Sequence, residues 1–64
     1  MSKVRRGGYV FVTLKGDHPP RHVHVLRGGR LILKWDLELH RPMEGFATRK
    51  LAALIRELEE EGLL

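Results

Sequence analysis

The alternation of apolar and polar positions along the chain predicts three β-strands. Residues 9–14 (YVFVTL) are β-branched and aromatic, a composition that is typical of strands. Residues 22–27 (HVHVLR) alternate with a period of two, and residues 30–37 (RLILKWDL) form the next apolar run. Between these two segments lies Gly28-Gly29, a pair that suits the positive φ angles of a two-residue hairpin turn. We therefore expect residues 22–37 to form an antiparallel hairpin.

The period of the pattern changes near residue 47, where a helix is expected to begin and to run to about residue 61. One apolar stripe at the spacing i, i+3, i+4 and i+7 consists of Leu51, Leu54, Ile55 and Leu58. Gly62 then supplies a stop signal for the helix. Residues 1–64 are thus predicted to form a single α+β domain. In it, a three-stranded antiparallel sheet carries one C-terminal helix packed on one face (β-β-β-α).

The side chains of each predicted strand alternate between the two faces of the sheet. The face expected under the helix holds Val10, Val12, Leu14, Val23, Val25, Leu31, Leu33 and Trp35. The opposite face is expected to hold Tyr9, Phe11, Thr13, His22, His24, Leu26, Arg30, Ile32 and Lys34. Because a single helix covers only one face, we expect this second face to be open and to serve as a binding surface or an oligomer interface.

The size of the chain limits its stability. A chain of 64 residues buries only about 60% of the surface that its unfolded form exposes, so its core is marginal. The sequence contains no cysteine, which excludes disulfides and thiolate metal sites. Small domains of this kind commonly gain stability from a second subunit, and we expect a homodimer. No apolar run has the length of a signal peptide or a membrane span, so we expect a cytoplasmic protein without a membrane partner.

Charge is distributed unevenly along the chain, whose net charge is +4. Residues 1–35 carry eight lysines and arginines and one aspartate, whereas residues 36–64 carry four basic and seven acidic residues. The basic half is suited to attract phosphate backbones. In the predicted helix, Arg49 and Lys50 come first and Glu59 to Glu61 come last, which is the reverse of the order that the helix dipole favours. One explanation is that Arg49 and Lys50 are placed for a ligand or partner; the other is that packing of the apolar stripe outweighs a small electrostatic cost.

The segment HPPRHVHV (residues 18–25) carries the candidate chemistry. His22 and His24 lie two positions apart on a predicted strand, so both imidazoles project from one face and suit two ligands of one divalent metal ion. Candidates for a further ligand are His18, Asp17 and His40. The same imidazole pair is also a candidate for general acid–base catalysis. The structural alternative is that these histidines hydrogen-bond loop backbone and stiffen the Pro-Pro corner. We expect no cofactor other than this metal.

The order of four segments carries a family resemblance: GGYVFV, DHPPRHVHV, GGR followed by an apolar strand, and a helix introduced by Gly-Phe. This order resembles the bacterial domain-of-unknown-function family numbered 4160 (DUF 4160) over nearly the whole chain, with DHPPRHVHV as its specific part. The resemblance implies a small regulatory protein of a toxin–antitoxin-like gene pair, and no particular reaction. The chain departs from the family at Arg21, where proline is common, and at Ala47, where a helix-capping serine is common. We therefore expect the helix to lack that cap.

Three functions are consistent with this pattern. In the first, the open face binds RNA or DNA by aromatic stacking and phosphate contacts. The residues expected to bind are Tyr9, Phe11, His18, Arg21, Arg30, Lys34, Arg5 and Arg6. In the second, a looser likeness to small toxin ribonucleases implies that His22 or His24 acts as acid or base while Arg21 or Lys34 stabilises the charged intermediate. In the third, the face binds a cognate small protein. We expect a small basic regulatory module of toxin–antitoxin type that binds nucleic acid or a partner protein through the open sheet face, with the ribonuclease as the alternative.

Overall fold

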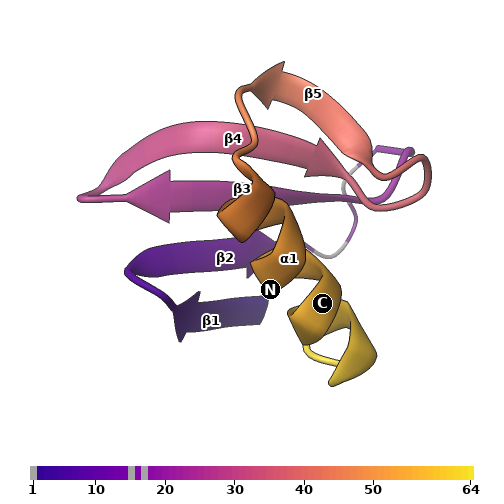
Figure 1. The fold of residues 1–64 in the computed structure, drawn as a ribbon. Helices are drawn as coiled ribbons and strands as arrows, with labels where there is room; N and C mark the ends of the chain where they lie inside the picture. The colour runs from indigo at the N-terminus through magenta and orange to yellow at the C-terminus, as the bar shows by residue number, and fades with distance from the viewer. Residues whose placement is uncertain (1, 15, 17) are drawn as a thin grey trace.

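The computed structural model describes residues 2–14, 16 and 18–64 and shows one antiparallel sheet crossed by one helix (Figure 1). The strands pair in chain order: β1 (Ser2–Arg6), β2 (Tyr9–Thr13), β3 (His22–Arg27), β4 (Arg30–Asp36) and β5 (Arg41–Gly45). The helix α1 (Arg49–Glu60) lies across one face of this sheet. The α+β class is confirmed, but the predicted three-stranded sheet is wrong, because the sheet has five strands.

The two strands that the sequence pattern missed form the two edges of the sheet. β1 has the sequence SKVRR, in which a single apolar residue gives no strand-like run. It pairs with β2 through a hairpin whose turn is Gly7-Gly8, with φ angles of 61° and 83°, the same turn chemistry that marks Gly28-Gly29. β5 contains a proline and ends in a glycine, which indicated a loop. Proline is tolerated in an edge strand because one side of the strand makes no ladder hydrogen bonds.

The predicted face assignment is wrong for β2. Phe11 is 0% exposed and lies in the core under α1, and it pairs across the sheet with Val25. Val25 in turn pairs with Leu33, and directly opposed residues share a face. Val10 and Val12 therefore lie on the face that α1 does not cover. Among the other residues expected under the helix, Val23, Val25, Leu33 and Trp35 are buried as predicted, whereas Leu14 and Leu31 are exposed. Ile32, expected on the open face, packs against the core instead.

The helix begins two residues later than expected. Its N-cap is Thr48, whose hydroxyl oxygen accepts a hydrogen bond from the backbone N–H of Leu51 at 3.1 Å. The expectation of a lost cap, based on Ala47, is therefore wrong, because the next residue supplies it. The helix buries Leu51, Ile55 and Leu58 against the sheet, and Leu54 packs at the edge of the core. The dipole-reversed order of charges is confirmed: the first turn has no acidic residue and the last turn has no basic residue.

Candidate functional site

The open face of the sheet is crossed by a row of side chains, one from each strand, that we call the cross-sheet row. Its members face one another in consecutive pairs and are Lys3, Val12, His24, Lys34 and Glu44. With Leu26, they lie on the side of the sheet opposite to the buried Phe11, Val25 and Leu33. Two of the five side chains are ammonium groups, and a third is an imidazole. Lys3 and Lys34 carry the positive charge of the row, and Glu44, opposite Lys34, adds one negative charge at its β5 end.

A second, shorter row lies beside the first. Arg5 of β1 pairs with Val10 of β2, and Val10 pairs with Leu26 of β3. Val10, Val12 and Leu26 are half-buried, so the middle of the open face is apolar and its β1 edge is cationic. Most of the described carboxylates lie elsewhere: Glu57, Glu59, Glu60 and Glu61 belong to the C-terminal half of α1 and its cap. The fold thus separates a basic sheet face from an acidic helix end.

The two strand histidines lie side by side near one end of β3. Their ring centroids are 5.0 Å apart with an interplanar angle of 65°. Nδ1 of His22 lies 2.8 Å from the carbonyl oxygen of Pro20, the kind of backbone hydrogen bond that the structural alternative expected. Nδ1 of His24 is buried and has no hydrogen-bond partner within the described part of the chain. The imidazole pair is thus fixed by the corner on one side and packed into the sheet on the other.

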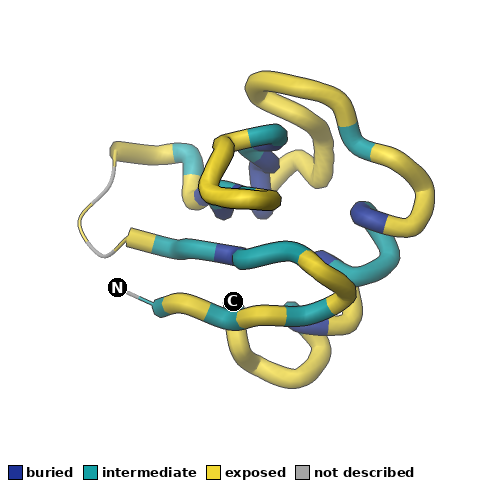
Figure 2. The backbone as a smooth tube through the Cα atoms, turned by 90° about the vertical axis from the view of Figure 1, so that its left-hand side faces the viewer, coloured by how far each residue is buried: buried dark blue, intermediate teal, exposed yellow. Residues whose placement is uncertain are grey.

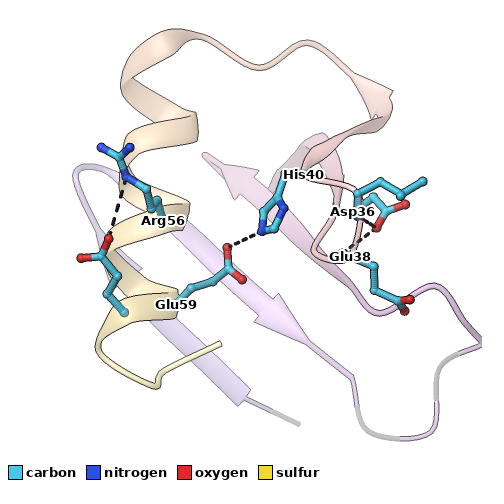
Figure 3. A network of polar contacts seen from close by, with 7 residues as sticks. Asp36, Glu38, His40, Arg56 and Glu59 are labelled. Atoms are coloured by element: carbon cyan, nitrogen blue, oxygen red, sulfur yellow. Dashed lines mark hydrogen bonds and ion pairs between the residues drawn. The ribbon is translucent and has the colours of Figure 1, made fainter.

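The metal hypothesis needs three ligands at one point. In the part of the chain that the structure describes, no three His, Cys, Asp or Glu side chains come together in such a group. His18, His22 and His24 are all described, so the predicted trio does not converge here; Asp17, another candidate ligand, lies outside the described residues. His40 lies on the other side of the molecule, with Nε2 3.7 Å from Oε1 of Glu59 (Figure 3).

Three of the predicted binding residues do not face the open surface. Phe11 is in the core, and Tyr9 packs against that core with its ring centroid 6.3 Å from that of Phe11. Arg27 covers the ring of Tyr9, its guanidinium carbon 5.6 Å from the centroid. Arg6 makes a bidentate ion pair with Glu61, in which Nη2 lies 2.9 Å from Oε1. The described part of the open face therefore lacks the two aromatic side chains that were predicted to stack on bases.

The other predicted binding residues keep an exposed position or a place on the face. Arg5 and Lys34 lie on the rows described above, and His18, Arg21 and Arg30 are exposed. Arg21 donates its backbone N–H to Oε2 of Glu38 at 2.6 Å, which ties the Pro-Pro corner to the β4–β5 turn. Lys3 was missed, because β1 was not predicted. Its signal in the sequence is Gly7-Gly8, a hairpin turn that requires a strand on each side.

Comparison of the chain with protein-family models, with curated proteins and with solved structures found no match in any of the three. The resemblance to the DUF 4160 family therefore stays a prediction from the sequence. No helix in the described residues is both long and apolar enough to cross a membrane.

The β4–β5 turn is held by the carboxylate of Asp36, which is buried (Figure 3). Its Oδ1 accepts hydrogen bonds from the backbone N–H groups of Glu38, at 2.8 Å, and Leu39, at 2.9 Å. The hydrogen bond from Leu39 has the largest effect on the pKa of Asp36 and lowers it below its ordinary value of 3.8. The hydrogen bond from Glu38 and the charges of Arg41 and His22 lower this pKa further. The turn places His40, which has a positive φ of 54°, beside the helix.

The pKa shift of Asp36 predicts a pH-dependent stability. A carboxyl group with a lowered folded pKa contributes stability above its unfolded pKa, and this contribution is lost as the pH falls through the folded pKa. Asp36→Asn retains an acceptor oxygen but removes the charge. We expect this variant to be less stable than the wild type at about pH 6 and the difference to shrink by about pH 3. Urea unfolding followed by circular dichroism at both pH values measures it.

The matched control is Glu44→Gln, which removes an exposed carboxylate from the neighbouring strand. This variant is expected to change the urea midpoint little at either pH. A difference between wild type and Asp36→Asn that stays constant from neutral to acidic pH would show that the charge of Asp36 does not stabilise the turn.

Proposed function

We propose that the protein is a small basic regulatory module of toxin–antitoxin type that binds single-stranded nucleic acid through the open sheet face. The observation that carries the binding proposal is the cross-sheet row, in which Lys3 and Lys34 flank Val12 and His24. Arg5 adds a third cation beside Lys3. The toxin–antitoxin setting is supported by the HPPRHVHV resemblance alone.

The spacing of these cations suits a phosphate backbone. Lys3 and Lys34 stand three strands apart, which at a strand spacing of about 4.8 Å is roughly 14 Å. A backbone that crosses from β1 to β4 would meet a lysine at each end and the imidazole of His24 between them, and would stop short of Glu44 on β5. The half-buried Val10, Val12 and Leu26 offer an apolar surface for bases or sugars. With Tyr9 and Phe11 turned to the other face, we expect phosphate contacts to dominate, and hence weak sequence preference and strong salt dependence.

The test is a fluorescence-anisotropy titration of a labelled single-stranded RNA at several salt concentrations. The triple variant Lys3→Gln/Arg5→Gln/Lys34→Gln is expected to bind more weakly than the wild type. It is also expected to reduce the slope of log affinity against log salt by about 2, since each lost contact to a single strand removes about 0.7. The physical reason is that fewer counterions are released when fewer phosphates are neutralised.

The matched control removes three cations from the helix: Lys50→Gln/Arg49→Gln/Arg56→Gln. These side chains lie on α1, on the other side of the sheet, so this variant is expected to keep the wild-type slope. If the helix variant loses as much affinity for RNA as the sheet variant, the RNA is attracted by the net positive charge of the whole protein, and the open face is not the binding site. If the wild type fails to bind RNA even at low salt, the binding proposal is wrong.

The ribonuclease alternative uses the same face of the sheet. The ribonuclease alternative needs His22 and His24 as acid and base with Lys34 near the scissile phosphate, and the structure does place Lys34 opposite His24. The nitrogen of His22 that contacts Pro20 and the buried nitrogen of His24 are both Nδ1, so Nε2 is the candidate proton carrier of each ring. The ribonuclease therefore stays a prediction, which the integrity of the titrated RNA on a denaturing gel decides.

A further inference from the structure

A groove lies on the helix side of the molecule, between α1 and the β4–β5 turn, far from the open face. Its volume is about 520 Å³. The lining residues come from β4, the turn and the helix and are Trp35, His40, Arg49, Ala52, Ala53, Ile55, Arg56 and Glu59. Figure 3 shows the rim, where His40 reaches from the turn toward Glu59 of the helix. The groove is thus built from three separate parts of the fold.

The floor of the groove is apolar. Trp35 and Ile55 are buried, and Ala52 and Ala53 present only methyl groups, so the helix leaves room for a compact apolar body. Trp35 is 8% exposed, and its indole Nε1 is buried with no hydrogen-bond acceptor among the described residues. Because this nitrogen is itself buried, a ligand in the groove cannot reach it, and Trp35 contributes only apolar surface to the floor.

The rim carries cations that the fold leaves largely uncompensated. Arg49 and Arg56 are seven residues apart on one side of α1, about 10 Å along the helix axis. Arg56 lies 4.0 Å from Glu60 in an exposed pair, which binds it weakly. Arg49 has no ion-pair partner within residues 2–14, 16 and 18–64. The acidic group on the rim, Glu59, is itself paired with His40.

The position of Arg49 in the helix points to an anion. It is the first residue of α1, where the positive end of the helix dipole already favours negative charge, and no acidic residue occupies the first turn. A cation at this position raises the local positive potential further. An anionic group bound here would interact favourably with both the guanidinium and the helix end.

We propose that this groove binds a small organic anion, with a compact apolar body on the floor of Trp35, Ala52 and Ala53 and a carboxylate or phosphate at Arg49. The apolar floor explains why a bare inorganic ion is not the expected ligand. The volume of about 520 Å³ suits a small molecule and is within the range of known ligand pockets. The site is independent of the nucleic-acid face, so either proposal stands or falls alone.

The test uses the single tryptophan of the chain, which gives one indole N–H signal in a ¹H–¹⁵N NMR spectrum. Phenyl phosphate, benzoate and inorganic phosphate are titrated separately into the full-length protein. We expect the two aromatic anions to shift the indole signal of Trp35 and the backbone signals of Ala52 and Ala53 in a saturable way. The comparison of phenyl phosphate with benzoate shows which anionic group the site prefers, and inorganic phosphate is expected to bind at least about tenfold more weakly.

Two variants test the site itself. Arg49→Gln is expected to weaken binding of the better aromatic anion about tenfold, whereas Lys50→Gln, the same charge change one residue along and outside the groove lining, is expected to change it less than about twofold. Ala53→Leu fills the floor with a good helix former and is expected to abolish binding while the folded spectrum persists. The absence of a saturable shift with both aromatic anions, equal losses in Arg49→Gln and Lys50→Gln, or unchanged binding by folded Ala53→Leu would each overturn the proposal.

Discussion

Gly45→Ala is expected to destabilise the protein by about 3 kcal/mol or more, a large part of the total stability of so small a domain. Gly45 ends β5 with a φ angle of +85°, a conformation that costs a residue with a Cβ about 1–2 kcal/mol. A Cβ here would also overlap the carbonyl oxygen of Ile32 and lie 3.1 Å from its carbonyl carbon. Because these are backbone atoms of a central strand, neither can move without disturbing the β4–β5 pairing. Urea unfolding followed by circular dichroism measures the loss.

The chain offers a close control for the conformational part of this effect. Gly8 has a φ angle of +83°, and a Cβ added there would meet nothing within 4 Å. Gly8→Ala is therefore expected to cost only the roughly 1–2 kcal/mol of backbone strain. The difference between the two variants isolates the clash with Ile32. If both alanine variants lose the same stability, the close approach of β5 to β4 is not a constraint on residue 45.

Phe11→Ala is expected to destabilise the protein by about 3–5 kcal/mol and to leave much of it unfolded at room temperature. The side chain is fully buried between the sheet and α1, where it contacts the same core as Leu51 and Leu58. Its removal leaves a cavity that a core of this size has few side chains to fill. Thermal unfolding followed by circular dichroism measures the effect, and Phe11→Leu, which keeps most of the volume, is expected to lose less than about 1.5 kcal/mol.

Val12→Ala is the control for Phe11→Ala, and the pair of variants distinguishes the two possible faces of β2. Val12 lies on the open face and is half-buried, so its truncation is expected to cost about 1 kcal/mol or less. The opposite order of effects, with Val12→Ala the more damaging, would place Val12 in the core and return Phe11 to the surface, as the sequence pattern alone suggested.

The central hairpin and the helix were predictable because their signals are strong and local. The alternating HVHVL segment, the Gly28-Gly29 turn and the leucine stripe of the helix each have one reading, and β3 has the predicted bounds. The face of β2 was not predictable in the same way. In YVFVTL the hydroxyl groups of Tyr9 and Thr13 lie on the same side of the strand as Phe11, so the pattern favoured water on the side that is in fact buried. Only the register with β3, a tertiary property, places Phe11 with the core.

The candidate site followed from the sequence only in part. Lys34 lies opposite His24 as expected, but His22, which was expected on the exposed face, is buried. The stacking residues were misplaced together with β2, and Lys3 was missed together with β1. The groove beside Trp35 was not predicted, since it depends on how the β4–β5 turn folds toward the helix. The one sequence signal for this groove was the order of charges in the helix, which is the reverse of what the helix dipole favours. A ligand near Arg49 was one of the two explanations that this order allowed.

The two outer strands restrict how copies of this protein can associate. β1 forms one edge of the sheet and carries Lys3, Arg5 and Arg6. β5 forms the other edge and is exposed along its whole length (Figure 2). Its pairing with β4 is irregular because it contains Pro42 and because the register shifts next to Trp35. Like charges and a missing N–H group oppose the addition of another strand at either border. The sheet therefore resists extension into a continuous intermolecular sheet, the route by which many small β-rich proteins aggregate. If the expected homodimer forms, its subunits should not join by pairing of edge strands, and the protein should remain dispersed at high concentration.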